Sequence, residues 1–91
     1  MKAVKLTQQE FALVAVHKQL ELAEVDTSVL QTDKEWFTNY TMTREQHKQW
    51  KDWFIEQFRL NFKRPKKEAL REFQWFDLGY GLRIKDPEQT Q

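Results

Sequence analysis

The sequence predicts an all-α protein: a compact domain of three helices, at about residues 8–24, 44–62 and 66–78, with an ordered connector and a short extended carboxyl-terminal segment. Three observations predict this fold class. Two capping-box patterns each precede a long stretch of helical periodicity. Bulky apolar residues recur at helical spacing in all three stretches. The 91 residues include only two Gly and two Pro, which suits long, uninterrupted helices.

The first helix is expected to begin after Thr7. Thr7 and Glu10 have the spacing of a capping box, in which each side chain accepts the backbone N–H of the other residue. Helical periodicity then predicts a core-facing stripe, closed at one end by Leu6 and Phe11. The stripe comprises Leu13, Val16, Leu20 and Ala23. FALVAV is also compatible with a buried strand, but the HKQLELAE that follows favours one helix to about Glu24.

Residues 26–40 are less regular and are predicted to form a connector that can contain one short helical turn. Its Asp, Ser and Thr side chains compete for backbone hydrogen bonds and favour turns. Long connectors without regular structure are uncommon in compact domains, so apolar residues of this one are expected to hold it against the core. These residues are Val29, Leu30, Trp36 and Phe37.

The second helix, residues 44–62, follows a second capping box formed by Thr43 and Gln46. One stripe along it contains Trp50, Phe54, Phe58 and Phe62, with Ile55 at its edge and His47 in line. Trp53 and Leu60 lie on another side. We expect that side to pack against the first helix, because the middle helix of three is covered twice.

Pro65 suits the start of the third helix, where its missing N–H is no loss. This helix is expected to form an αα-hairpin with the second through the turn at 63–65. Ala69, Phe73, Phe76 and Tyr80 share its core face, whereas Trp75 points away. Gly79 and Gly81 are expected to end the helix with positive backbone angles. Residues 82–84 should then lie extended, and residues 86–91 should form a frayed tail.

Length and composition predict a single domain spanning residues 1–91. Lys and Arg total 15 against 14 Asp and Glu, which excludes an acidic DNA mimic and a strongly basic nucleic-acid binder. The absence of Cys excludes a disulfide framework and is compatible with a reducing cytoplasm. No apolar run approaches the ~18 residues of a membrane span, and MKAVKLTQQE lacks a signal-peptide apolar region. We therefore expect a cytoplasmic protein that does not enter a membrane.

Residues typical of catalytic and metal sites occur only in weak patterns. His17 and His47 have no His or Cys companion at helical spacing, and Ser28 lacks a nucleophile turn. Asp52 and Glu56 lie four residues apart but among Lys and Arg, which indicates a solvated face more than an acid–base pair. We expect no enzyme activity, no metal and no cofactor.

A basic corner marks the junction of the second and third helices. It comprises Arg59, Lys63, Arg64, Lys66, Lys67 and Arg71. Cations at the carboxyl end of the second helix offset its macrodipole, which is a purely structural explanation. The alternative is an electrostatic contact with a phosphate backbone or an acidic protein face, and phosphate contacts would carry no base specificity.

Trp53 and Trp75 each lie off the main stripe of their helix. For Trp53 we favour packing between helices. For Trp75 burial and exposure are equally compatible with the sequence, because Arg71, Gln74 and Leu78 surround its side. An exposed Trp75 would form a credible protein-binding or self-association patch.

Residues 35–84 contain WFTNYTMT before the second helix, WKDWFIE within it, and EFQWFDLGYGLRI at the end. In these motifs the chain resembles small uncharacterised proteins encoded by tailed bacteriophages. The resemblance covers somewhat more than half of the chain and transfers no functional residues. It implies a genomic setting and a location in the host cytoplasm. Small phage proteins of this type often bind host proteins, including defence or nucleic-acid enzymes.

Three functions of different classes follow from these features. The first is a small non-enzymatic accessory protein that modulates or inhibits a host protein by occluding its working surface. Its contacts would come from Trp75, Leu78, Arg71 and Lys67. The second is a nucleic-acid-binding accessory protein that uses the basic corner. The third is a self-associating structural protein.

Overall fold

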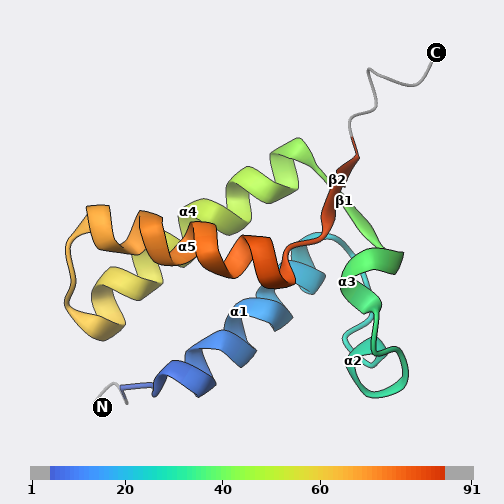
Figure 1. Cartoon of the computed structure of the whole chain (residues 1–91), viewed down its shortest axis with the longest axis horizontal. Coiled ribbons are helices and arrows are strands. Elements are labelled where there is room, and N and C mark those ends of the chain that lie inside the picture. The colour runs from blue at the N-terminus through green and yellow to red at the C-terminus, as the bar shows by residue number, and fades with distance from the viewer. Residues whose placement is uncertain (1–4, 86–91) are drawn as a thin grey trace.

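The computed structural model describes residues 5–85, so the tail expected at 86–91 lies outside the described residues. Most of the chain is helical, but the prediction of three helices without strands is wrong in detail, because two one-turn helices and a small parallel sheet are also present (Figure 1). In chain order the elements are α1 (Gln8–Leu22), α2 (Val29–Thr32), α3 (Trp36–Asn39), β1 (Thr41–Thr43), α4 (Arg44–Phe62), α5 (Lys66–Tyr80) and β2 (Arg83–Lys85).

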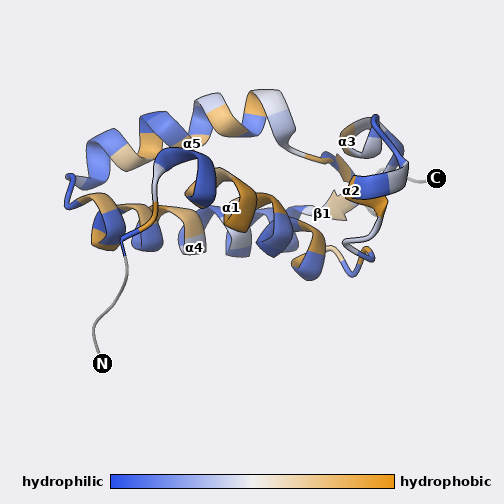
Figure 2. Ribbon diagram, turned by 90° about the horizontal axis from the view of Figure 1, so that it is seen from below, coloured by the Kyte–Doolittle hydropathy of each residue, from blue (hydrophilic) through white to orange (hydrophobic). Residues whose placement is uncertain are grey.

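The central helix is α4, against which both α1 and α5 pack (Figure 1). Hydrophobic and hydrophilic segments alternate along these three helices, as amphipathic helices require (Figure 2). The predicted hairpin of α4 and α5 is confirmed. Its short turn begins at Lys63, whose N–H donates to the Arg59 carbonyl and whose left-handed backbone (φ 55°, ψ 48°) ends α4.

Both predicted capping boxes are confirmed. The Thr7 hydroxyl accepts the Glu10 N–H at 3.2 Å, and the Glu10 carboxylate accepts the Thr7 N–H at 2.9 Å. At α4 the corresponding distances between Thr43 and Gln46 are 3.0 and 2.8 Å. These bonds satisfy N–H groups that the first helical turn leaves without intrahelical partners.

The connector is more regular than the sequence predicted, because its polar side chains begin short helices instead of only turns. The Asp26 carboxylate accepts the Ser28 N–H just before α2. This bond, and to a smaller extent one that the Ser28 hydroxyl donates, lowers the pKa of Asp26. Asp33 accepts the Glu35 N–H in the same way before α3. The predicted attachment to the core is confirmed by Trp36, which is buried.

The two strands pair in parallel, with Thr41 opposite Arg83 and Met42 opposite Ile84. Met42 is 1% exposed and belongs to the core, whereas all three residues of β2 are exposed. The sequence predicted an extended segment after α5 but not its partner. The two strands are some forty residues apart, so their pairing requires the chain to return past β1. The local sequence does not encode that return.

The core is largely aromatic and is centred on Trp50, which is fully buried. Its ring contacts Phe73 at a centroid distance of 5.0 Å, and its Nε1 donates to the Ala15 carbonyl of α1 at 2.9 Å. Phe11 contacts Phe54 edge to face at 5.1 Å. Edge-to-face ring pairs add about 0.5–1.5 kcal/mol each beyond the area that they bury. Trp50 thus joins all three long helices.

The predicted core stripe of α1 is partly wrong. Leu20 is buried as expected, but Leu13 is 55% exposed, and Phe11 and Ala15 face α4. Periodicity identifies an apolar side, but α1 has apolar residues on several sides, and the position of α4 selects among them. The helix also ends earlier than predicted, at Leu22. Glu24 then adopts a positive φ of 62°, which stops the helix without a glycine.

The predicted end of α5 is also wrong. The helix continues through Gly79 to Tyr80, and neither Gly79 nor Gly81 has a positive φ. Gly81 is needed for a different reason. A Cβ atom at this position would lie within 1.8 Å of the Asp77 Oδ1 atom, so only glycine permits the close approach. Tyr80, predicted to face the core, is 49% exposed because it lies in the last turn.

Candidate functional site

The four residues predicted for protein binding lie together on the outer face of α5. Lys67, Arg71, Trp75 and Leu78 follow one another at helical spacing, opposite the buried Ala69 and Phe73. We call these four residues the Trp75 face. Trp75 is 59% exposed and Leu78 is 86% exposed, and both cations are exposed as well. The structure therefore brings the predicted residues together on an accessible surface.

Trp75 also lines a cleft between α1, α4 and α5, which we call the aromatic cleft. Its volume is about 270 Å³. The lining residues are Gln8, Phe11, Ala12, Phe54, Phe58, Phe62, Glu72, Trp75 and Phe76. Phe58 and Phe62 are only partly buried, and their ring centroids lie 4.7 Å apart. The Trp75 face is thus continuous with a hollow that exposes aromatic surface.

Trp53 differs from Trp75 because α1 covers it. Its ring stacks on Phe11 at a centroid distance of 5.9 Å and an interplanar angle of 16°, so the predicted packing between helices is confirmed. Leu60 does not follow Trp53 into this contact and is 67% exposed, so its predicted burial is wrong. The two side chains line an open hollow on the opposite side of α1 from the aromatic cleft.

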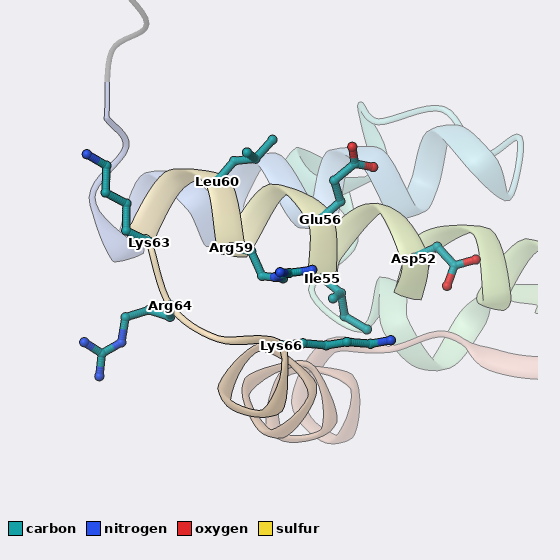
Figure 3. A pocket seen from close by; sticks show the side chains of 8 residues that line it. All are labelled: Asp52, Ile55, Glu56, Arg59, Leu60, Lys63, Arg64 and Lys66. Carbon is teal, nitrogen blue, oxygen red and sulfur yellow. The ribbon is translucent and has the colours of Figure 1, made fainter.

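The basic corner is exposed but does not converge on one point. Arg64 donates to Glu68 at 3.0 Å, and Lys63 and Arg64 extend outward from the turn (Figure 3). The adjacent hollow, of about 640 Å³, mixes acidic and basic side chains with Ile55 and Leu60. Its charged residues are Asp52, Glu56, Arg59, Lys63, Arg64 and Lys66. This arrangement is not a uniformly cationic groove.

His47 and Asp77 form a contact that the sequence did not predict. The His47 Nε2 and Asp77 Oδ2 atoms lie 3.0 Å apart, and the two side chains are 18% and 33% exposed. The His47 ring packs against Trp50 and Phe73. The pair joins the beginning of α4 to the last turns of α5 and so helps to hold the Trp75 face in place. The only sequence signal was the position of His47 in line with the α4 stripe.

Gln19 makes a second unpredicted link to α5. Its side chain is fully buried; Nε2 donates to the Tyr80 carbonyl at 3.0 Å, and Oε1 accepts the Leu82 N–H at 2.7 Å. These two bonds fix the chain as it leaves α5. Gln19 lies four residues after Ala15 and eight after Phe11 on the face that meets α4, but only the packing of α1 on α4 identifies that face.

The candidate metal and acid–base residues do not assemble. Between residues 5 and 85 no three His, Cys, Asp or Glu side chains are grouped to hold a metal ion. Asp52 forms an ion pair with Lys48 at 3.3 Å, and Glu56 is exposed, as expected for a solvated face. Asp52 and Glu56 therefore lie on a charged, solvated face and do not form a shared acid–base site.

No helix in the part of the chain that the structure describes is long and apolar enough to cross a membrane. The exposed large apolar residues of this part lie on α1, α4 and α5, except Ile84, which lies in β2. No protein-family model, curated protein or solved structure matches this chain.

Proposed function

We propose that this protein is a small, non-enzymatic binding protein whose contact surface is the Trp75 face. The observation that carries the proposal is the exposure of Trp75 and Leu78, at 59% and 86%, beside two exposed cations on one face of α5. Clustered exposed apolar side chains mark interaction sites, and Trp and Arg are enriched among the residues that dominate binding energy.

The surrounding contacts support this role because they hold α5 in one position. Ala69 and Phe73 anchor its inner side in the core, and Asp77 contacts His47 near its end. Gln19 fixes the Tyr80 carbonyl directly after the Trp75 face. A surface that is ordered before binding loses less conformational entropy when a partner arrives.

The resemblance to small proteins of tailed phages suggests the class of partner. On this proposal the protein is a phage-type accessory protein in the host cytoplasm, and the partner is a host protein such as a defence or nucleic-acid enzyme. The protein acts by occupying the partner's working surface, which modulates or inhibits it without chemistry.

Affinity capture from a bacterial host lysate, with quantitative mass spectrometry, tests the proposal. The wild-type protein should retain one or more host proteins, and Trp75→Ala should lose them while its melting temperature stays unchanged. Leu60→Ala is the matched control, because Leu60 is similarly exposed but lies outside the aromatic cleft. Capture of no host protein, or full capture by Trp75→Ala, would contradict the proposal.

Nucleic-acid binding is a second candidate, and one specific observation favours it. Lys66 and Lys67 occupy the first turn of α5, where the helix macrodipole disfavours cations, so helix stability does not explain them. Titration of labelled single-stranded and duplex DNA should then show binding at low salt that falls steeply as salt rises. Absence of binding at low salt removes this candidate.

Self-association through the Trp75 face is the third candidate. A second copy would cover Trp75 and Leu78, which are exposed in the single chain. Light scattering should then give a mass above that of one chain, 11.2 kDa, and Trp75→Ala should restore the single-chain mass. A mass of one chain at all concentrations rules this candidate out.

A further inference from the structure

The aromatic cleft exists because α1 and α5 both pack on α4 but diverge toward its carboxyl end (Figure 1). At that end the start of α1 is held to α4 by Asn61, which accepts the Leu6 N–H at 2.8 Å and donates to the Leu6 carbonyl at 3.0 Å. Phe58 and Phe62 form the floor, and Trp75 lines the side formed by α5. The cleft is therefore a stable feature of the helix arrangement.

The cleft has room for a few apolar side chains of a partner rather than for a whole small ligand. Its volume of about 270 Å³ lies below the roughly 300–1,000 Å³ of typical small-molecule pockets. The accessible floor runs from Phe58 to Phe62, four residues, or about 6 Å at 1.5 Å per residue, because Phe54 beyond it is 3% exposed. Apolar side chains at positions i and i+4 of a bound helix span about 6 Å by the same rise, and this spacing is typical of helix-in-groove recognition.

The charge on the Trp75 face is positive. Within residues 5–85, Lys67 and Arg71 form no ion pair, whereas Glu68 is already paired with Arg64. Glu72 is the acidic residue that lines the cleft itself. Arg71 lies one turn before Trp75 on α5, so a partner that covers Trp75 also approaches Arg71.

We infer that the aromatic cleft and the Trp75 face together receive one amphipathic helix of a partner protein, which carries acidic side chains beside its apolar ones. This inference rests on the proposed protein-binding function. The apolar side chains of that helix enter the cleft over Phe58 and Phe62 and pack against Trp75. Its carboxylates pair with Arg71 and Lys67, which attracts an acidic segment and repels a basic one.

Three labelled 18-residue helical peptides test the inference by fluorescence anisotropy with the full chain. The first has Leu, Trp and Leu at i, i+4 and i+7 with Glu at the flanking positions. The second has Lys in place of each Glu, and the third keeps Glu but has Ala at the three apolar positions. The acidic peptide with its apolar residues should bind at least about tenfold tighter than either other peptide.

Variants of the protein identify the surface. Trp75→Ala should weaken binding of the acidic peptide by about tenfold or more, as truncation of a central contact residue does. Arg71→Glu should weaken binding of the acidic peptide and improve binding of the basic one. Leu60→Ala and Lys34→Glu are matched controls for apolar area and for charge, and both should bind like the wild type.

Several results would overturn the inference. Equal binding of the acidic and basic peptides would show that charge does not select the partner. Full affinity of Trp75→Ala for the acidic peptide would show that the cleft is not its binding site. Trp75-dependent binding of labelled single-stranded DNA without peptide binding assigns the surface to nucleic acid. If a host protein is captured through Trp75 but no peptide binds, the acidic helix is refuted while the proposed protein-binding function stands.

Discussion

Replacement of Gln19 by Met should destabilise the fold more than any surface change of similar size. Met approximates the length of Gln but cannot pair with the Leu82 N–H or the Tyr80 carbonyl. The Leu82 N–H bond is buried and costs about 1–3 kcal/mol when left unsatisfied. The Tyr80 carbonyl bond is only partly buried, so its loss should add about 0.5–1 kcal/mol.

The two contributions together give an expected loss of about 1.5–4 kcal/mol. For a domain of this size each kcal/mol lowers the melting temperature by about 4–8 °C, which predicts a fall of roughly 6–32 °C. Urea unfolding followed by Trp fluorescence measures the free energy of unfolding, and an unchanged m-value shows that the unfolded state is comparable.

Gln9→Met is the matched control, because Gln9 is exposed on the same helix. It should change the free energy of unfolding by less than about 0.5 kcal/mol. Gln19→Glu adds a further check, because a carboxylate keeps an acceptor for the Leu82 N–H but cannot donate to the Tyr80 carbonyl. A loss below about 0.5 kcal/mol in Gln19→Met would refute the role of this side chain as a link between α1 and the end of α5.

Two further predictions concern positions where the structure determines whether a substitution or a change of pH raises or lowers stability. Gly81→Ala should destabilise the fold by about 1–3 kcal/mol, because its Cβ would displace the Asp77 carboxylate. Gly79→Ala should instead stabilise α5 by about 0.5–1 kcal/mol, because a Cβ at position 79 meets open space. Equal effects of the two substitutions in thermal melts would contradict the role given to Gly81. The lowered pKa of Asp26 means that its contribution to stability is present above its ordinary value of 3.8 and is lost as the pH falls through the folded-state value. The difference in free energy of unfolding between wild type and Asp26→Asn should therefore narrow below about pH 4. A difference that stays constant from about pH 7 to about pH 2 would contradict this role of the Asp26 carboxylate.

Features that depend on neighbouring residues could be predicted from the sequence. The capping boxes at Thr7 and Thr43 form as expected because their bonds span only three residues. The stripe of α4, with Trp50 and Phe54 buried, follows from periodicity alone. The attachment of the connector through Trp36 was also predictable, because a long segment in a small domain has to bury its largest side chain.

Features that depend on close approach between distant segments could not be predicted from the sequence. Gln19 looks like a surface residue until the end of α5 and Leu82, just before β2, bring backbone groups to its amide. Gly81 looks like a helix stop, but its role comes from the position of the Asp77 side chain. The parallel pairing of β1 with β2 similarly requires the whole hairpin of α4 and α5 to return the chain.

The two Trp-Phe pairs of α4 and α5 show which features the sequence determines and which the tertiary structure determines. In each pair the sequence alone determined that Phe turns toward the core and that Trp lies about 100° aside. Only the tertiary structure decided the fate of each Trp. Phe11 of α1 stacks on Trp53 and covers it, whereas no element among residues 5–85 covers Trp75, which stays 59% exposed. Helical spacing sets the direction of a side chain, but burial requires a second element at that place.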